Sequence, residues 1–503
     1  MKSRALLLPL LAALAGCELG PDYMRPMAPV PATYREDQGW MPASPQQAAG
    51  WENWWAIYND PILDGLEKQV DVSNQNLKAA EASYRAARAQ VGIERGQLLP
   101  TVTANASARQ SGGGSGGQAS SGNGSAGGGN STRTTYQASL GGSWEVDVWG
   151  RIQRTVEETV ASAQASAADV AAARLSAQSE LAVDYFQIRA ADAQAQLLMA
   201  TIEDFQQALL IARNRYQVGI TTEADVFAAQ TEIDNAQAEL VNLQLTRARM
   251  EHAIATLVGR PTGDVMVPVA SLAVIVPVVP AGVPSTLLER RPDIASSEFT
   301  MASANAGIGV AQAAWYPDLT LTGSYGFAST SLGSLFGAPS SLWSFGPGLT
   351  QLVFDGGALA AQNEQARARY DQAVATYRQT VLAAFQQVED QLAALKILQE
   401  QAVVENQTVA DARQSEQLAL NQYRAGTADF TTVITAQTAR LNAESAALGV
   451  LNQRLAASVN LVVALGGGWD NSRIPQPGSH YDLPETAASD DPQPQAVPAG
   501  LGR

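Results

Sequence analysis

The chain has 503 residues, of which 46% are hydrophobic and 16% are charged. Its 48 acidic residues against 32 basic ones give a net charge of −16, which argues against a nucleic-acid-binding surface. Two histidines and one cysteine exclude a disulfide within the chain and leave too few ligands for a Cys/His zinc site. We therefore expect neither a metal nor a cofactor, and no enzyme.

The N-terminus predicts a lipid anchor. Lys2 and Arg4 precede a short apolar stretch that is typical of a signal peptide and too short to span a membrane. Leu14-Ala15-Gly16-Cys17 resembles the bacterial lipobox. This resemblance implies that residues 1–16 are removed and that Cys17 is acylated, and Glu18 after the cysteine favours the outer membrane. An ordinary signal peptide followed by a coincidental cysteine is the alternative.

The rest of the sequence shows no clear transmembrane helix. The most apolar stretch, residues 265–283, contains Pro268, Pro277 and Pro280. Each proline inside a helix costs about 3 kcal/mol, so this stretch is predicted to be an extended connector. An outer-membrane protein without such a helix must cross the bilayer as a β-barrel or be only anchored to it.

Four segments alternate apolar and polar residues, as half-buried strands do. They begin at Thr101, Tyr136, Asp318 and Trp343, and the last one, running to Phe354, is expected to contain a bulge around residues 346–348. A soluble sandwich and a lipid-facing barrel wall both fit this pattern. Four strands cannot close a membrane barrel, which needs about eight, so several chains must combine their strands. Three chains would supply twelve and two would supply eight.

Long heptad patterns predict coiled-coil helices. One helix should run from about Ile152 to Tyr216, which is roughly 100 Å at 1.5 Å per residue, and this implies a rod. The pattern occurs twice at an offset of 207 residues, which places Gly219 on Gly426. Each glycine follows a long helix as a left-handed cap, and a second helix begins a few residues later. Two helical hairpins are therefore predicted.

Several motifs together resemble outer membrane efflux proteins of the TolC/OprM type, in the lipoprotein branch that serves resistance-nodulation-division pumps. They are Gly20-Pro21-Asp22-Tyr23, Trp54-Trp55, Arg290-Arg291-Pro292-Asp293-Ile294, Ala304-Asn305-Ala306-Gly307-Ile308-Gly309, Tyr423-Arg424-Ala425-Gly426-Thr427 and Ala464-Leu465-Gly466-Gly467-Gly468-Trp469. The resemblance implies a mainly α homotrimer with a twelve-stranded barrel in outer-membrane lipid, a helical periplasmic tunnel and a mixed equatorial domain. It also implies a periplasmic adaptor and an inner-membrane pump as partners.

This resemblance leads to a division of the chain. The expected parts are the signal peptide 1–16, an N-terminal equatorial segment 17–72, a first repeat 73–260, a proline-rich connector 261–290, a second repeat 291–468 and a C-terminal tail 469–503. The charged run at residues 290–293 is interpreted as the start of a helix rather than an active site, since Pro292 and Asp293 suit a first helical turn.

The candidate functional residues lie at the hairpin tips. By resemblance, the adaptor contacts are Val218, Gly219, Ile220, Ala425, Gly426 and Thr427, and the periplasmic gate consists of Asp225, Tyr216 and Tyr423. Asp225 also fits a capping box that begins at Thr222, a purely structural role. Where the family often carries further acids this chain has Thr432 and Thr435. Closure is therefore expected to depend mainly on helix packing.

Two other functions remain open at this point. One is the duct of an ATP-driven secretion system, and the other is a structural coiled-coil lipoprotein without a pore. The alternating strands and the duplicated hairpins favour a channel. The transported substrate cannot be inferred, because the inner-membrane pump selects most of it.

Overall fold

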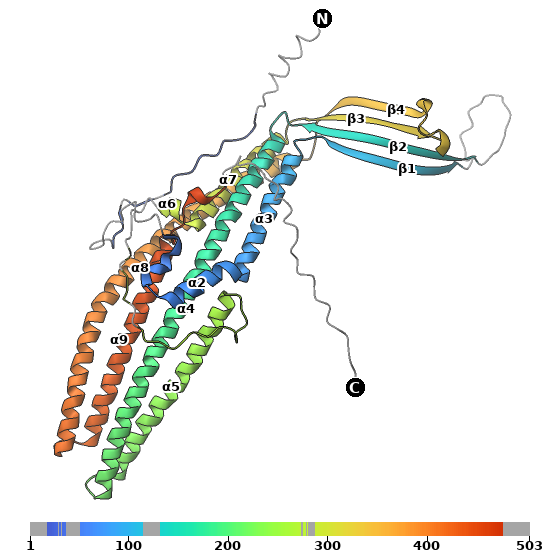
Figure 1. The fold of residues 1–503 in the computed structure, drawn as a ribbon. Helices are drawn as coiled ribbons and strands as arrows, with labels where there is room; N and C mark the ends of the chain where they lie inside the picture. Colours follow the sequence, from blue (N-terminus) through green and yellow to red (C-terminus); the bar gives the residue numbers. More distant parts are fainter. Residues whose placement is uncertain are drawn as a thin grey trace, which may run out of the picture.

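A β-sheet and a long helical rod make up the molecule, with the sheet at one end and both hairpin tips at the other (Figure 1). The computed structural model describes residues 18–28, 30–31, 33–36, 51–113, 131–272, 275–277, 279 and 287–475. Cys17, the signal peptide, most of the Gly/Ser-rich stretch 111–130 and the end of the C-terminal tail lie outside the described residues.

The sheet is antiparallel, with its strands in the order β1-β2-β3-β4. The strands are β1 (Thr101–Gly113), β2 (Ser131–Val146), β3 (Asp318–Ser329) and β4 (Ser341–Thr350). The predicted bulge in the last strand is wrong, because β3 and β4 pair one to one throughout, with Leu321 opposite Pro347. Proline fits here since β4 has only one neighbour in the chain, and an edge strand tolerates a missing N–H.

The helical part contains two very long helices and several shorter ones. Its elements are η2 (Trp51–Tyr58), α2 (Pro61–Ser73), α3 (Gln75–Gly96), α4 (Arg151–Gln217), α5 (Glu223–Leu257), α6 (Leu287–Arg290), α7 (Pro292–Ala313), η4 (Leu332–Ser334), η5 (Ala338–Ser340), α8 (Ala358–Ala425), α9 (Phe430–Ala464) and η6 (Asn471–Arg473). With 67 and 68 residues, α4 and α8 confirm the predicted rod.

The long helices lie side by side in a single row. Near the sheet, α4 contacts α3 and α7, and α7 contacts α8. Towards the tips, α4 contacts α5 and α9, and α9 contacts α8 (Figure 1). The two repeats therefore form one curved wall, in which α4 joins the first repeat to the second.

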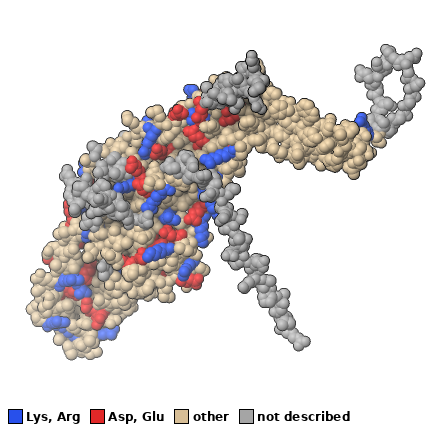
Figure 2. All heavy atoms as spheres, turned by 45° about the horizontal axis from the view of Figure 1, so that its top comes forward, with Lys and Arg blue, Asp and Glu red and all other residues tan. Residues whose placement is uncertain are grey.

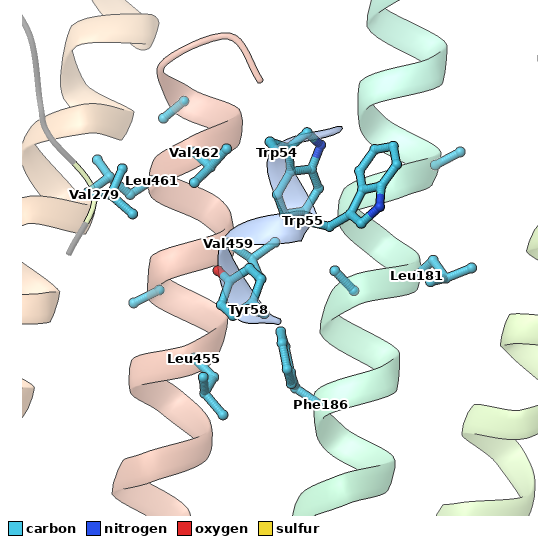
Figure 3. Packing of buried hydrophobic residues seen from close by; sticks show 14 of the residues in the cluster. Trp54, Trp55, Tyr58, Leu181, Phe186, Val279, Leu455, Val459, Leu461 and Val462 are labelled. Atoms are coloured by element: carbon cyan, nitrogen blue, oxygen red, sulfur yellow. The ribbon is translucent and has the colours of Figure 1, made fainter. Parts of the chain in front are cut away.

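Aromatic residues of η2 fill the centre of this wall. Trp54 and Trp55 are each 1% exposed. Tyr58 lies between α4 and α9, with its ring 4.9 Å from that of Phe186 and its hydroxyl 2.7 Å from Ser458 Oγ (Figure 3). Burial of one large apolar side chain stabilises a fold by about 1.5–3 kcal/mol, so this cluster holds the middle of the rod together.

One helix, α9, is long and apolar enough to cross a membrane by length and composition. Sequence analysis does not predict such a segment. The structure explains the composition of α9, because its apolar residues pack against α4 and α8 inside the wall. We therefore interpret α9 as a helix of the wall, and no other helix in the described part of the chain is long and apolar enough to cross a membrane.

The segment that follows the sole cysteine is held firmly against α4 and α7. The Arg154 side chain, 3% exposed, forms ion pairs with Glu18 at 3.4 Å and Asp22 at 3.0 Å. A Cβ added to Gly20, which has φ of +101°, would lie 2.5 Å from the Cα of Gly309. Only glycine allows the two backbones to approach so closely, so this segment bridges both repeats.

A buried carboxyl group in α2 predicts a pH-dependent stability. Both oxygens of Glu67 are buried without a hydrogen-bond partner among the described residues. Burial, and then the charge of Asp71, raise the pKa of Glu67 well above its usual value. A raised pKa in the folded state means that the protein is stabilised below the unfolded pKa of about 4.3, and that this stabilisation is lost as the pH rises through the folded pKa.

We expect Glu67→Gln to remove this dependence, because the amide carries no charge at any pH. The wild-type protein should melt at a lower temperature at about pH 8 than at about pH 5, and the difference should shrink in the variant. Each unit of pKa shift corresponds to about 1.4 kcal/mol. Thermal melting of the purified protein measures the effect, and Glu81→Gln, at an exposed position of α3, is the control. An unchanged pH profile in Glu67→Gln would contradict the argument.

Candidate docking tips and periplasmic gate

Both hairpin turns use the same backbone geometry. Gly219 has φ of +78° and Gly426 has φ of +79°. In each turn the residue after the glycine donates its N–H to a carbonyl five residues back, from Ile220 to Arg215 and from Thr427 to Gln422, at 2.9 Å in both cases. This is a Schellman cap, in which glycine avoids the steric cost of the left-handed region. The predicted left-handed caps are confirmed.

The residues of both hairpin turns are exposed. Val218 and Ile220 are each 69% exposed, and no atom lies within 4 Å of a Cβ built on Gly219 or Gly426. The remaining predicted contact residues, Ala425 and Thr427, are also exposed. Apolar side chains at a protruding tip indicate a surface that is covered by another protein.

The two tyrosines predicted for the gate have unequal environments. Tyr423 is 3% exposed and lies 5.4 Å from the ring of Phe430, whereas Tyr216 is 44% exposed. Their positions are equivalent in the two repeats. Only Tyr423 is therefore packed inside its own protomer.

Arg215 joins the two hairpins and is a residue that sequence analysis missed. Its guanidinium lies 4.1 Å from the centre of the Tyr423 ring, and Nη2 donates to the Tyr423 carbonyl at 2.6 Å. A cation over an aromatic face contributes about 0.5–2 kcal/mol. The internal repeat contains a signal that could have identified Arg215. Its equivalent in the second hairpin is the uncharged Gln422, so this position is charged in the first hairpin only.

The predicted capping box at the start of α5 is wrong. Thr222 is the N-cap residue, but its side chain makes no capping hydrogen bond. Instead, the hydroxyl of Thr221 donates to the Asp225 carboxylate, which turns this carboxylate towards the turn. Burial raises the pKa of Tyr423, Arg215 lowers it and the charge of Asp225 raises it.

The positions where further acids were expected are exposed threonines on α9. Thr432 follows the start of the helix, and the Thr435 hydroxyl donates to the carbonyl of Thr431 at 2.8 Å. Neither residue adds charge near the tips. Other acids near the tips are Glu223, in the same first turn of α5 as Asp225, and Asp429, the N-cap residue of α9.

A second link between the hairpins lies further up the rod. Arg440 of α9 pairs with Asp204 of α4 at 2.5 Å and with Glu416 of α8 at 2.9 Å. Glu416 is 5% exposed. Removing one partner of such a network leaves a poorly hydrated charge behind, so this link holds α4, α8 and α9 together.

Charge is distributed very unevenly over the molecule. Lysines, arginines and acids are scattered over the rod, whereas the visible face of the sheet is nearly free of them (Figure 2). The sheet instead exposes large apolar residues, among them Trp343 at 77%, Phe345 at 74% and Leu349 at 70%. Such a surface suits the hydrocarbon region of a membrane.

The charged run at residues 290–293 has a structural role. Pro292 and Asp293 occupy the first turn of α7, and Arg291 pairs with Asp293 at 2.6 Å, which confirms the start of a helix. Among the described residues, no group of three or more His, Cys, Asp or Glu side chains is placed to hold a metal ion.

Comparison with known proteins shows which family this chain resembles. A family model described as outer membrane efflux protein matches residues 66–260 and 283–467. The toluene efflux pump outer membrane protein TtgC of Pseudomonas putida is 32% identical over 461 residues, which are 91% of this chain and 93% of that protein. The pyoverdine export outer membrane protein OpmQ of Pseudomonas aeruginosa is 30% identical over 437 residues, covering 86% of this chain and 91% of that protein.

Solved channels share the fold over most of the chain. The outer-membrane channel OprN has a TM-score of 0.82 at 29% identity, covering 90% of this chain and 100% of the other. The outer membrane channel CmeC of Campylobacter jejuni has a TM-score of 0.82 at 26% identity, covering 91% of this chain and 96% of the other.

Proposed function

Because the chain belongs to the outer membrane efflux protein family, we propose that its two hairpin tips dock onto the periplasmic adaptor of a tripartite efflux system. The protein is the outer-membrane channel of such a system, its exit duct. It is a trimer, so three four-stranded sheets supply the twelve strands of the barrel, and the helices continue as a periplasmic tunnel. Membership of a channel family removes the alternative of a structural lipoprotein without a pore.

The equivalent, exposed tips are the observation that carries the docking proposal. A trimer would have six tips, two from each protomer, and the three tips of the first hairpin would present Val218 and Ile220 towards the inner membrane. A photo-crosslinking amino acid at Val218 should capture the adaptor in cells, and the same group at Glu81 of α3 should not. Capture at Glu81 with none at Val218 would place the adaptor elsewhere.

The pump is proposed to be of the resistance-nodulation-division type, by resemblance to the lipoprotein branch of the family. The duct then has no catalytic role, and the pump selects the substrate. Pull-down of the adaptor with its bound inner-membrane protein would distinguish this pump from an ATP-driven exporter. Recovery of an ATPase would favour the secretion duct instead.

The gate is proposed to lie just above the tips. Tyr423, packed between Arg215 and Phe430, would hold the two hairpins of a protomer together in the closed state. Asp225 and its copies in the trimer would add negative potential near the aperture and favour cations. Adaptor binding can open such a gate only by a higher affinity for the open tips than for the closed ones.

Cys17 is proposed to be the acylated membrane anchor and to be dispensable for the fold. With an ordinary cleavable signal peptide, Cys17→Ala should still form membrane-inserted trimers, since the helices and strands are stabilised by their own contacts. Mass spectrometry of the wild type should find lipid on this cysteine. Loss of all barrel insertion in Cys17→Ala, or an unmodified wild-type cysteine, would refute the proposal.

A further inference from the structure

The helices of the lower rod leave two ends unpartnered within the protomer. The row runs α8, α9, α4, α5, so α8 and α5 each have a neighbour on one side only (Figure 1). In a closed ring of three protomers, α8 of one protomer must therefore meet α5 of the next. The question is which residues face one another across this seam.

Both end helices expose apolar residues at heptad spacing. On α8 these are Ile397, Val404 and Leu418, which are 62%, 64% and 54% exposed. On α5 they are Phe227 and Val241, which are 62% and 63% exposed. Residues seven or fourteen apart lie on one face of a helix, so each helix has an apolar stripe that is typical of a coiled-coil contact.

The internal repeat supplies the register of this contact. The offset of 207 residues between Gly219 and Gly426 maps α4 onto α8 and α5 onto α9, with the helix starts in register. The seam between protomers is thus equivalent to the contact of α4 with α9 inside a protomer. There, Asp204 pairs with Arg440. The same pairing across the seam brings Asp411 of α8 to the level of Ile233 of α5.

The apolar stripes give a register that lies one residue away. An antiparallel pairing that places Asp411 beside Asp234, the exposed neighbour of the buried Ile233, places Val404 beside Val241. One heptad further, it places Leu418 beside Phe227. The repeat and the exposed side chains therefore agree to within one residue.

The charges differ sharply between the two kinds of contact. Inside the protomer the acid Asp204 has Arg440 as its partner. Across the seam the position of Arg440 is taken by the apolar Ile233. The carboxylates of Asp411 and Asp234 accept hydrogen bonds from glutamines of their own helices, Gln407 and Gln230, at 2.9 and 3.0 Å. Two carboxylates at one level of a contact repel each other.

We propose that α8 of one protomer and α5 of the next form the subunit seam with Val404 against Val241, and that the facing Asp411 and Asp234 make it weaker than the contact within the protomer. The inference rests on the trimeric channel but not on adaptor docking by the tips.

Disulfide trapping tests the register. With Val241→Cys and Val404→Cys in one chain, oxidation should link the protomers into covalent oligomers and deplete the monomer on a non-reducing gel. The pair Val241→Cys and Ile397→Cys is one heptad out of register and should leave the monomer unlinked. If the matched pair does not assemble, Phe227→Cys with Leu418→Cys tests the same alignment. Equal or stronger linking of the mismatched pair overturns the register.

Equivalent aspartates test the difference between the contacts. Asp411→Asn removes the repulsion and should raise the dissociation temperature of the purified trimer, whereas Asp204→Asn breaks the tie to Arg440 and should lower the melting temperature. Asp411→Arg should raise the dissociation temperature further, because it would pair with Asp234 of the next protomer. A trimer weakened by Asp411→Asn would refute the repulsive seam. Purified trimers contain no adaptor, so the outcome is independent of tip docking.

Discussion

Replacing Gly426 with tryptophan is expected to abolish efflux while the trimer and its barrel persist. The glycine has φ of +79° in a tip whose surroundings are empty, so the indole would protrude into whatever covers the tip. A residue other than glycine in the left-handed region costs roughly 1–2 kcal/mol, which a large folded channel tolerates. Drug susceptibility of cells and crosslinking to the adaptor measure the effect.

Alanine at the same position separates backbone strain from steric bulk. Gly426→Ala adds the strain with only one methyl group, so it should retain most efflux. Gly219→Trp should behave like Gly426→Trp, because the two turns share their geometry. A Gly426→Trp trimer that supports full efflux and crosslinks normally would show that the tips are not the docking surface.

Tyr423→Ala is expected to open the channel more than any other single change at the gate. The side chain is buried against Phe430 and under the Arg215 guanidinium, and removal of a buried large aromatic side chain costs about 3–5 kcal/mol. Tyr216→Ala is the matched control, since this residue is equivalent in the repeat but 44% exposed. Single-channel recording at low salt should show a large rise in conductance for Tyr423→Ala and a small one for Tyr216→Ala.

Asp225→Ala should change the ion selectivity of the channel rather than the extent to which the channel opens. Its three copies in the trimer would concentrate negative potential, so the variant should lose cation preference with only a modest rise in conductance. Arg215→Ala should resemble Tyr423→Ala in part, because it removes the cation above the ring but leaves the packing against Phe430. If Asp225→Ala alone produced a wide, non-selective pore, the three Asp225 carboxylates would hold the gate closed. The proposal that helix packing around Tyr423 holds it closed would then be wrong.

The local residue pattern in the sequence was sufficient to predict the long helices and most of the strands. Heptad spacing places α4 within a residue of its observed ends, because only a continuous helix keeps such a stripe on one face. The left-handed caps at Gly219 and Gly426 also follow from local chemistry. Strand alternation predicts the starts of β1 and β3, but β2 begins at Ser131 rather than Tyr136, and β4 ends at Thr350 rather than Phe354. The sequence motifs indicated the family, and the family indicated the trimer.

Tertiary structure alone decided which faces meet and which charges pair. Arg215 reaches Tyr423, which is 208 residues away in sequence, and Arg440 reaches Asp204, 236 residues away. Equivalent residues of the repeat, such as Tyr216 and Tyr423, differ in exposure because Tyr423 packs against Phe430 and under the Arg215 guanidinium, whereas Tyr216 remains 44% exposed. The periodicity of the sequence shows which side chains are apolar and on which face of the helix they lie. It does not record which helix covers that face, since this depends on contacts between segments that are distant in the chain.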